Sequence, residues 1–187
     1  MGKTVRRTPS KVNTEEFYQV PPDILSRYQN LTVAIDIMYF DRILFLLTIT
    51  RVIHFYTVEK INNCENRTIL DCLRKVLNMY QTRGFSVQFI LGDDKFRHMK
   101  DEVMTEIKCH LNWTAAGEHV PEAEQAIRVI KERARCITST WKFKWVPILF
   151  KTSLIKFLVF WLNSIPQANS IMPNISSKAI LIGPLPD

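Results

Sequence analysis

Three acidic residues, far apart in the chain, have the surroundings expected of metal ligands. Asp36 stands in the middle of the apolar run 31–40, where a carboxylate is costly unless it is hydrogen-bonded or paired with a cation. Asp93 follows the apolar run 86–91, and Glu124 lies near the start of a long helical pattern. Hard divalent ions such as Mg²⁺ prefer carboxylate oxygens, and pairs of such ions, roughly 3.5–4 Å apart, serve phosphodiester chemistry. The three acids therefore predict a site for metal-dependent phosphodiester transfer.

Each of these acids also has a purely structural interpretation. A buried aspartate can be held by hydrogen bonds, Gly92-Asp93-Asp94 is favourable turn chemistry, and an acid near a helix N-terminus interacts well with the helix dipole. Asp94 and Glu122 are rival candidates for the second and third ligand. The sequence leaves these alternatives open, because they differ only in how the chain brings the side chains together.

Basic residues continue the helical face on which Glu124 lies. Arg128, Lys131 and Arg135 follow Glu124 at spacings that put them on roughly the same side of a helix. The 187-residue chain has a formal net charge of +7, and the excess lies in residues 1–12 and in the C-terminal third. A positive surface of this kind favours a polyanion, with nucleic acid as the first candidate and an acidic membrane as the second. We expect the three bases to contact a phosphate backbone.

The hydropathy period and the turn residues predict the strands and helices that position these residues. The run 31–40 predicts a strand buried on both faces, and the chain then continues through a turn at Asp41-Arg42 into further β-rich runs. The period changes to that of a helix over 66–82, with Asn66 as a candidate N-cap and Gly84 beyond its end. The predicted strands are 31–40, 43–50, 52–58, 86–91 and 107–114, and the predicted helices are 66–82, 96–105, 122–138 and 148–163.

A helix between two buried strands is a crossover, so the strand at 86–91 should run parallel to the first. The predicted fold is α/β, a five-stranded mixed sheet flanked by helices in the order β-β-β-α-β-α-β-α-α, which is the order of a ribonuclease-H-like domain. The expected organisation is a basic arm and linker over 1–29, a catalytic core over 30–165 and an irregular tail over 166–187.

Three motifs resemble those of retroelement integrases, most closely those of copia-like retrotransposons. Ala34-Ile35-Asp36-Ile37-Met38-Tyr39 and the run 45–51 are similar to their first two core strands. Gly92-Asp93-Asp94-Lys95-Phe96 is similar to their second acidic motif, and 118–128 to the third, in which a glutamate near the start of a helix is followed by a basic residue. The resemblance covers about 30–185. Asp94 and Gln125 depart from the family pattern, which puts some DNA contacts in doubt but not the metal ligands.

The resemblance implies a catalytic and metal-binding triad of Asp36, Asp93 and Glu124 holding two Mg²⁺ or Mn²⁺ ions. It implies a DDE-type polynucleotidyl transferase and endonuclease that trims DNA 3′ ends and joins them to target DNA, with His119 at the substrate loop. The same analogy implies that the protein forms a homo-oligomer and is part of a longer polyprotein. It also implies a location in a cytoplasmic particle and in the nucleus. The alternatives are a domesticated or inactive domain that only binds nucleic acid or a protein, and a ribonuclease H or resolvase on the same fold.

The patterns of cysteines and of apolar residues limit the classes of protein to which the chain can belong. The four cysteines form no CxxC pair, so we expect reduced thiols in an intracellular protein rather than a disulfide framework or a structural zinc site. The basic, polar N-terminus has no apolar core of a signal peptide. The apolar stretches 43–58 and 145–162 are both interrupted by bases, so we expect no membrane-spanning segment.

Overall fold

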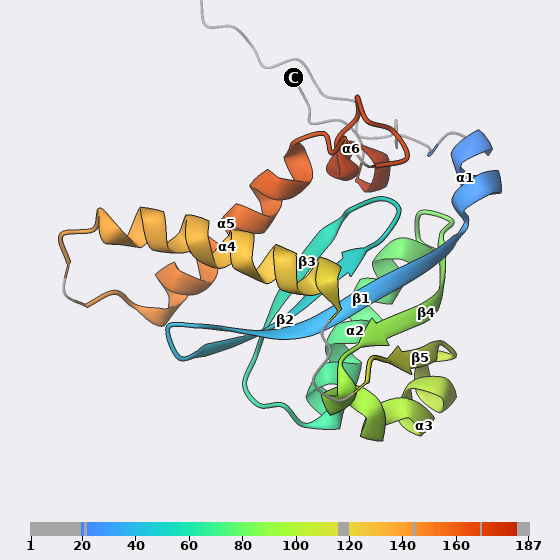
Figure 1. Ribbon diagram of the computed structural model, residues 1–187, viewed down its shortest axis with the longest axis horizontal. Coiled ribbons are helices and arrows are strands. Elements are labelled where there is room, and N and C mark those ends of the chain that lie inside the picture. Colours follow the sequence, from blue (N-terminus) through green and yellow to red (C-terminus); the bar gives the residue numbers. More distant parts are fainter. Residues whose placement is uncertain (1–19, 21, 116–119, 144, 169, 183–187) are drawn as a thin grey trace, which may run out of the picture.

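The computed structural model describes residues 20, 22–115, 120–143, 145–168 and 170–182. A five-stranded sheet forms its centre, and helices cover both faces (Figure 1). The strands are β1 (Asn30–Phe40), β2 (Ile43–Thr50), β3 (Tyr56–Ile61), β4 (Ser86–Gly92) and β5 (His110–Trp113). The helices are α1 (Pro22–Tyr28), α2 (Asn66–Gln81), η1 (Asp94–Met99), α3 (Lys100–Glu102), η2 (Val103–Ile107), α4 (Pro121–Ser139), α5 (Ile148–Ser164) and α6 (Ser177–Leu181).

The strand order is β3-β2-β1-β4-β5, with β1 at the centre of the sheet. β1 pairs antiparallel with β2 and parallel with β4, while β4 pairs parallel with β5. The chain reaches β4 through α2, as the crossover argument requires. This arrangement confirms the predicted fold class, a mixed five-stranded α/β fold of the ribonuclease-H-like kind.

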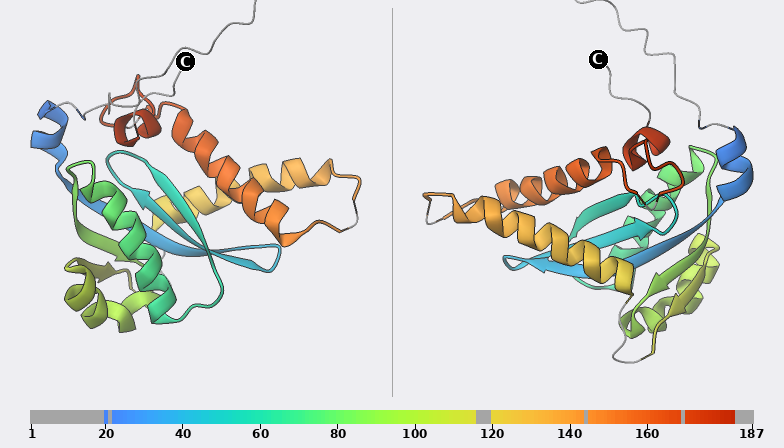
Figure 2. Two further views of the ribbon diagram at one scale, coloured as in Figure 1. Left: turned by 180° about the vertical axis from the view of Figure 1, so that it is seen from behind. Right: turned by 45° about the horizontal axis from the view of Figure 1, so that its top comes forward.

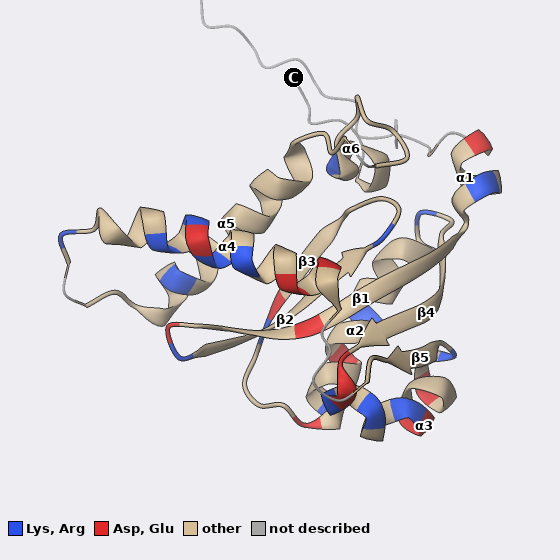
Figure 3. Ribbon diagram, viewed as in Figure 1, with Lys and Arg blue, Asp and Glu red and all other residues tan. Residues whose placement is uncertain are grey.

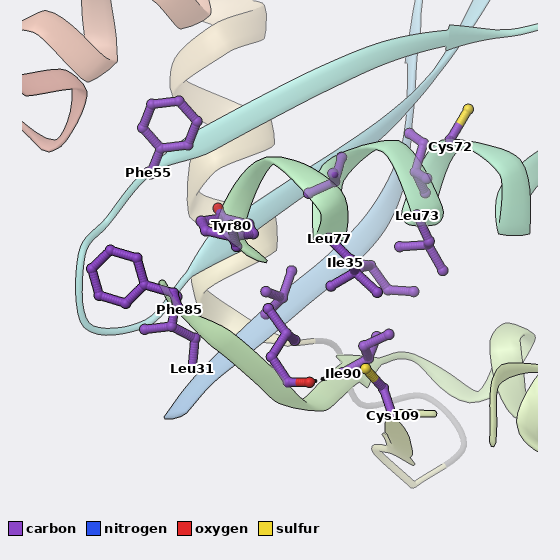
Figure 4. Packing of buried hydrophobic residues seen from close by; sticks show 14 of the residues in the cluster. Leu31, Ile35, Phe55, Cys72, Leu73, Leu77, Tyr80, Phe85, Ile90 and Cys109 are labelled. Atoms are coloured by element: carbon purple, nitrogen blue, oxygen red, sulfur yellow. Dashed lines mark hydrogen bonds between the residues drawn. The ribbon is translucent and has the colours of Figure 1, made fainter. Parts of the chain in front are cut away.

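Two hydrophobic cores lie on opposite faces of the sheet. On one face, α2 packs through Leu73, Leu77 and Tyr80 against Ile35 of β1 and Ile90 of β4, as Figure 4 shows at close range. On the other face, α4 covers β1 and β2, and α5 packs beside it on β3 (Figure 2). The buried residues of this second core that come from α4 are Ala126, Ile130 and Ala134. β1 is thus covered on both faces, which explains its nearly continuous apolar sequence.

The turn at Asp41-Arg42 is confirmed. Both residues have positive φ, 48° and 64°, as a two-residue hairpin with a primed turn requires. The third strand, however, begins at Tyr56 rather than at residue 52. The segment between β2 and β3 is a tight loop, in which the Thr50 hydroxyl accepts a hydrogen bond from the Phe55 amide at 3.0 Å. A buried Ile53 made this loop look like a strand in the sequence.

The predicted N-cap role of Asn66 is wrong. The N-cap residue of α2 is Glu65, without a side-chain cap, and Asn66 is the first helical residue. Its side chain is used elsewhere, since Nδ2 donates to Glu102 at 3.0 Å and Oδ1 lies 2.7 Å from His98 Nε2. Gly84 lies just beyond the helix with φ +82°, in agreement with the prediction that it ends this helix.

The segments predicted to be a linker and an irregular tail both contain short helices. α1 lies within 13–29 and buries Ile24, while α6 lies within 166–187 and buries Ile180 and Leu181 in the α2 core. Single apolar residues among prolines carried too weak a periodic signal to predict either helix. The division into arm, core and tail remains a prediction.

The region between β4 and β5 is less regular than predicted. Instead of one helix over 96–105, the chain forms 3₁₀, α and π turns in succession from Asp94 to Ile107. The following strand is correspondingly short, because Lys108 has a left-handed conformation with φ 62° and breaks the extended run. None of the helices among the described residues combines the length and apolar character needed to cross a bilayer.

Candidate functional site

Asp36 projects from the sheet face that α4 covers. Side chains alternate along a strand, so Asp36 shares a face with Ala34 and Met38. Ala34 belongs to a buried cluster with Val120 and Ala123 at the start of α4, and Met38 packs in the core that contains Ala126. The carboxylate therefore lies beneath the first turns of α4, on the central strand.

Asp93 reaches the same place from the carboxyl end of β4. The parallel register pairs Ala34 with Leu91, so the chain leaves β4 next to Asp36. Gly92 permits this exit, because a Cβ atom there would lie 2.7 Å from the buried Phe96 ring. The Phe96 amide in turn donates to the Asp93 carbonyl at 3.1 Å. The Gly-Asp-Asp-Lys-Phe sequence thus forms a tightly packed turn that holds Asp93 in position.

One ammonium group joins the two aspartates. Lys95 Nζ contacts Asp36 Oδ1 closely and lies 3.1 Å from Asp93 Oδ2. Burial would lower the pKa of Lys95, but hydrogen bonds and charge attraction from Asp36, and then from Asp93, outweigh burial and raise it. The lysine is therefore a cation at neutral pH. Sequence reasoning missed Lys95, although its place two residues after Asp93 is a usable signal.

The aspartate pair fits a divalent cation. The two side chains are only 17% and 16% exposed, and Asp93 Oδ1 is buried with no hydrogen-bond partner among the described residues. An unpartnered carboxylate oxygen beside a second carboxylate has the chemistry of a hard-ion ligand. A third ligand is not assembled with them, since the described residues contain no group of three His, Cys, Asp or Glu side chains placed to hold a metal.

Glu124 lies on the same side of the sheet as Asp36. It directly follows Ala123, which packs against Ala34, and its own side chain is exposed on the flank of α4. Pro121 at the first position of the helix and Val120 in the buried cluster hold this end of α4 against the sheet. The fold therefore brings the three predicted acids to one face, and the structure joins two of them through Lys95.

The two rival acids have other surroundings. Glu122 Oε1 forms an ion pair with Arg51 Nε at 2.8 Å, just beyond the end of β2. Asp94 is the first residue of η1 and lines an open concavity with Trp113. Neither contacts Lys95 in the way that Asp36 and Asp93 do.

The predicted phosphate-binding residues lie together. Glu124, Arg128, Lys131 and Arg135 line one groove of about 630 Å³ along α4. Charged positions of both signs follow one another along this helix, as Figure 3 shows. Arg128 and Arg135 are exposed and Lys131 is partly exposed, so all three are accessible to a ligand. His119, the fourth predicted DNA-binding residue, lies outside the described residues.

Comparison with known proteins agrees with this fold. The structure is similar to the crystal structure of the catalytic core domain of BIV integrase, with a TM-score of 0.55 over 80% of this chain and 92% of that one. The sequence identity is 10%, so the similarity concerns the fold. No protein-family model and no curated protein sequence matches the chain. The chain thus has the ribonuclease-H-like fold of an integrase catalytic core.

Proposed function

We propose that the chain is an integrase-type catalytic core that carries out metal-dependent trimming of DNA 3′ ends and their transfer to target DNA. The observation that carries the proposal is the pairing of Asp36 and Asp93 around one cationic group. They come from the centre of β1 and the carboxyl end of the neighbouring parallel β4, where ligand sites of open α/β sheets occur. The same fold in the BIV integrase core supports this proposal.

Asp36, Asp93 and Glu124 would hold divalent ions, Mg²⁺ or Mn²⁺. When bound, two such ions activate the attacking oxygen and neutralise charge on the leaving oxygen. The two aspartates are already paired, and Glu124 is exposed on the same side of the sheet, so its side chain has to approach them. The ion pair of Glu122 with Arg51 favours Glu124 over Glu122 as the third ligand.

The chain itself would bind and orient the DNA. Arg128, Lys131 and Arg135 line the groove that also contains Glu124, so a phosphate backbone held by these bases passes Glu124. Contacts of this kind fix position and carry little sequence information. We therefore expect weak sequence preference from this surface.

Self-association, as the analogy to copia-like elements implies, is part of the proposal. α5 exposes the large apolar side chains of Phe157, Phe160 and Trp161, which are 52%, 43% and 48% exposed. The rings of Phe157 and Trp161 contact each other edge to face, with their centroids 6.1 Å apart, and exposed apolar side chains that cluster in this way favour a protein partner. Sedimentation at increasing concentration tests whether that partner is a second copy, and a concentration-independent monomer would contradict it.

The test is a cleavage and strand-transfer assay on duplex DNA with Mn²⁺ or Mg²⁺. We expect 3′-end trimming and joined products from the natural chain, and loss of both from Asp36→Asn. Asp94→Asn is the matched control, because it removes a neighbouring acid that does not contact Lys95. Metal-dependent activity retained in Asp36→Asn would overturn the proposed site. Preferential cutting of an RNA–DNA hybrid would instead indicate a ribonuclease H.

A binding-only domain is the second candidate. Lys95 offsets part of the charge of the aspartate pair within the protein, which is compatible with an acid pair that serves structure alone. A Mn²⁺ titration distinguishes the two functions. Saturable binding that Asp36→Asn abolishes supports the catalytic core, whereas no uptake by the natural chain supports the binding-only domain.

A further inference from the structure

Trp113 lies at the edge of the sheet next to the aspartate pair. It is the last residue of β5 and pairs in register with Gly92, the residue before Asp93. Its side chain is partly exposed, in an open concavity of about 810 Å³. A partly exposed indole offers a flat aromatic face to a ligand, and neither the catalytic proposal nor the sequence pattern gave this residue a role.

Two cations converge on this indole. Arg97 Cζ lies 5.6 Å and Lys100 Nζ 5.5 Å from the centre of the Trp113 ring, and both residues line the same concavity. Neither forms an ion pair with a carboxylate among the described residues, so their charge remains available for a ligand. Figure 3 shows basic positions interspersed with acidic ones around α3, next to β5.

The concavity shares one residue, Lys95, with the aspartate pair. Lys95 lines it and also contacts Asp36 and Asp93 through Nζ. A DNA strand that passes Lys95 can therefore contact both the aspartate pair and this concavity. The lining also contains the acids Asp94 and Asp101, which repel a compact polyanion. A ligand with an aromatic group between its phosphates would therefore bind here more tightly than a compact polyanion.

We propose that Trp113, Arg97 and Lys100 form a binding site for an unpaired nucleotide of a DNA strand. Because Arg97 and Lys100 lie over the ring in the free protein, the base takes their place on the indole and the cations turn to the flanking phosphates. A paired base inside a duplex has no free face, so the site selects single-stranded over blunt double-stranded ends. The proposal deepens the proposed function, since trimming one strand of a duplex leaves its complement unpaired beside the aspartates.

The test is fluorescence anisotropy of the full chain with labelled oligothymidine and with a blunt duplex of equal length, in buffer with EDTA. We expect Trp113→Ala to bind oligothymidine roughly tenfold more weakly and Trp113→Phe to bind nearly as well as the natural chain, because an aromatic face remains. Trp145→Ala is the matched control, since Trp145 is exposed and lies outside the concavity. Equal binding by Trp113→Ala, or an equal loss with the blunt duplex, overturns the site.

A double variant tests the same site without replacing Trp113. Arg97→Gln with Lys100→Gln alters only exposed side chains, so it tests the site even if Trp113→Ala unfolds. We expect weaker oligothymidine binding and a shallower salt dependence from this double variant, and unchanged binding overturns the proposal. Because EDTA removes divalent ions, binding is measured apart from catalysis. A chain that binds through Trp113 but never cleaves DNA would contradict the proposed function and leave this site standing.

Discussion

Asp36 and Asp93 contact the same ammonium group, that of Lys95, one from the middle of β1 and the other from the residue that follows the neighbouring parallel strand β4. Opposite charge between two carboxylates relieves their mutual repulsion, and a divalent ion bound there would relieve it more strongly. The lysine and the ion would compete for the same oxygens.

Removal of single acids should separate catalysis from folding. Asp93→Asn and Glu124→Gln should each lower metal-dependent DNA cleavage by at least about a hundredfold, because each removes charge from the proposed metal site. Activity assays with thermal melting check this. Glu122→Gln is the control for Glu124, and it should lower stability slightly through loss of the Arg51 ion pair while retaining activity. Full activity in Asp93→Asn would show that another residue is the second metal ligand.

Substitution of Lys95 should change stability and metal affinity in opposite directions. Lys95→Gln leaves two carboxylates without their counter-ion, so the metal-free protein should lose stability. Because Lys95 is 39% exposed and screened by water, the loss should be only ~0.5–1 kcal/mol. Mn²⁺ should bind several-fold more tightly, since no ammonium competes with it. Calorimetric titration and melting check both, and weaker Mn²⁺ binding would show that Lys95 does not oppose the ion.

The basic flank of α4 should control DNA affinity. Replacing Arg128, Lys131 and Arg135 by glutamine should weaken duplex binding and reduce the slope of log affinity against log salt by roughly 0.9 for each lost phosphate contact. Arg133→Gln is the matched control, because Arg133 is exposed on the same helix but does not line the groove. Anisotropy over a salt series gives both quantities. An equal effect from Arg133→Gln would indicate general charge rather than this groove.

Asn163 should be important for stability. The buried side chain of this α5 residue accepts a hydrogen bond from the Tyr56 amide at 2.8 Å and donates one to the Tyr56 carbonyl at 2.7 Å, which ties the helix to edge strand β3. Asn163→Ala leaves both backbone groups without these partners, so the free energy of unfolding should fall by about 2–4 kcal/mol. Denaturant unfolding measures the loss. Ser164→Ala, which loses only a local helix bond, should change it little.

The four cysteines should divide into two reactivity classes. Cys64 and Cys136 are exposed and should react readily with a thiol reagent, while Cys72 and Cys109 are buried and should react only after unfolding. Burial raises the pKa of Cys109, so the folded state holds this proton more tightly than the unfolded chain. Its contribution to stability is full below the ordinary thiol pKa and is lost as pH rises through the folded value. Thiol labelling over a pH series checks this.

The sequence alone determined the fold class, because the main elements carry their own periodic signals. The apolar run of β1, the helical period of α2 and the short strand β4 imply a crossover, and a crossover implies parallel pairing. Local turn chemistry determined the hairpin at Asp41-Arg42. The same signals made Asp36 and Asp93 candidates, since a carboxylate within or directly after a buried strand needs a partner.

Only the tertiary structure decided which side chains meet. No local pattern encodes the contact of Lys95 with both aspartates or that of Arg51 with Glu122. The same holds for the convergence of Arg97 and Lys100 on Trp113. Periodicity reports which face of an element is buried, and that property is local. The identity of the neighbour across a sheet or beneath a helix depends on register and packing, which arise only when the whole chain has folded.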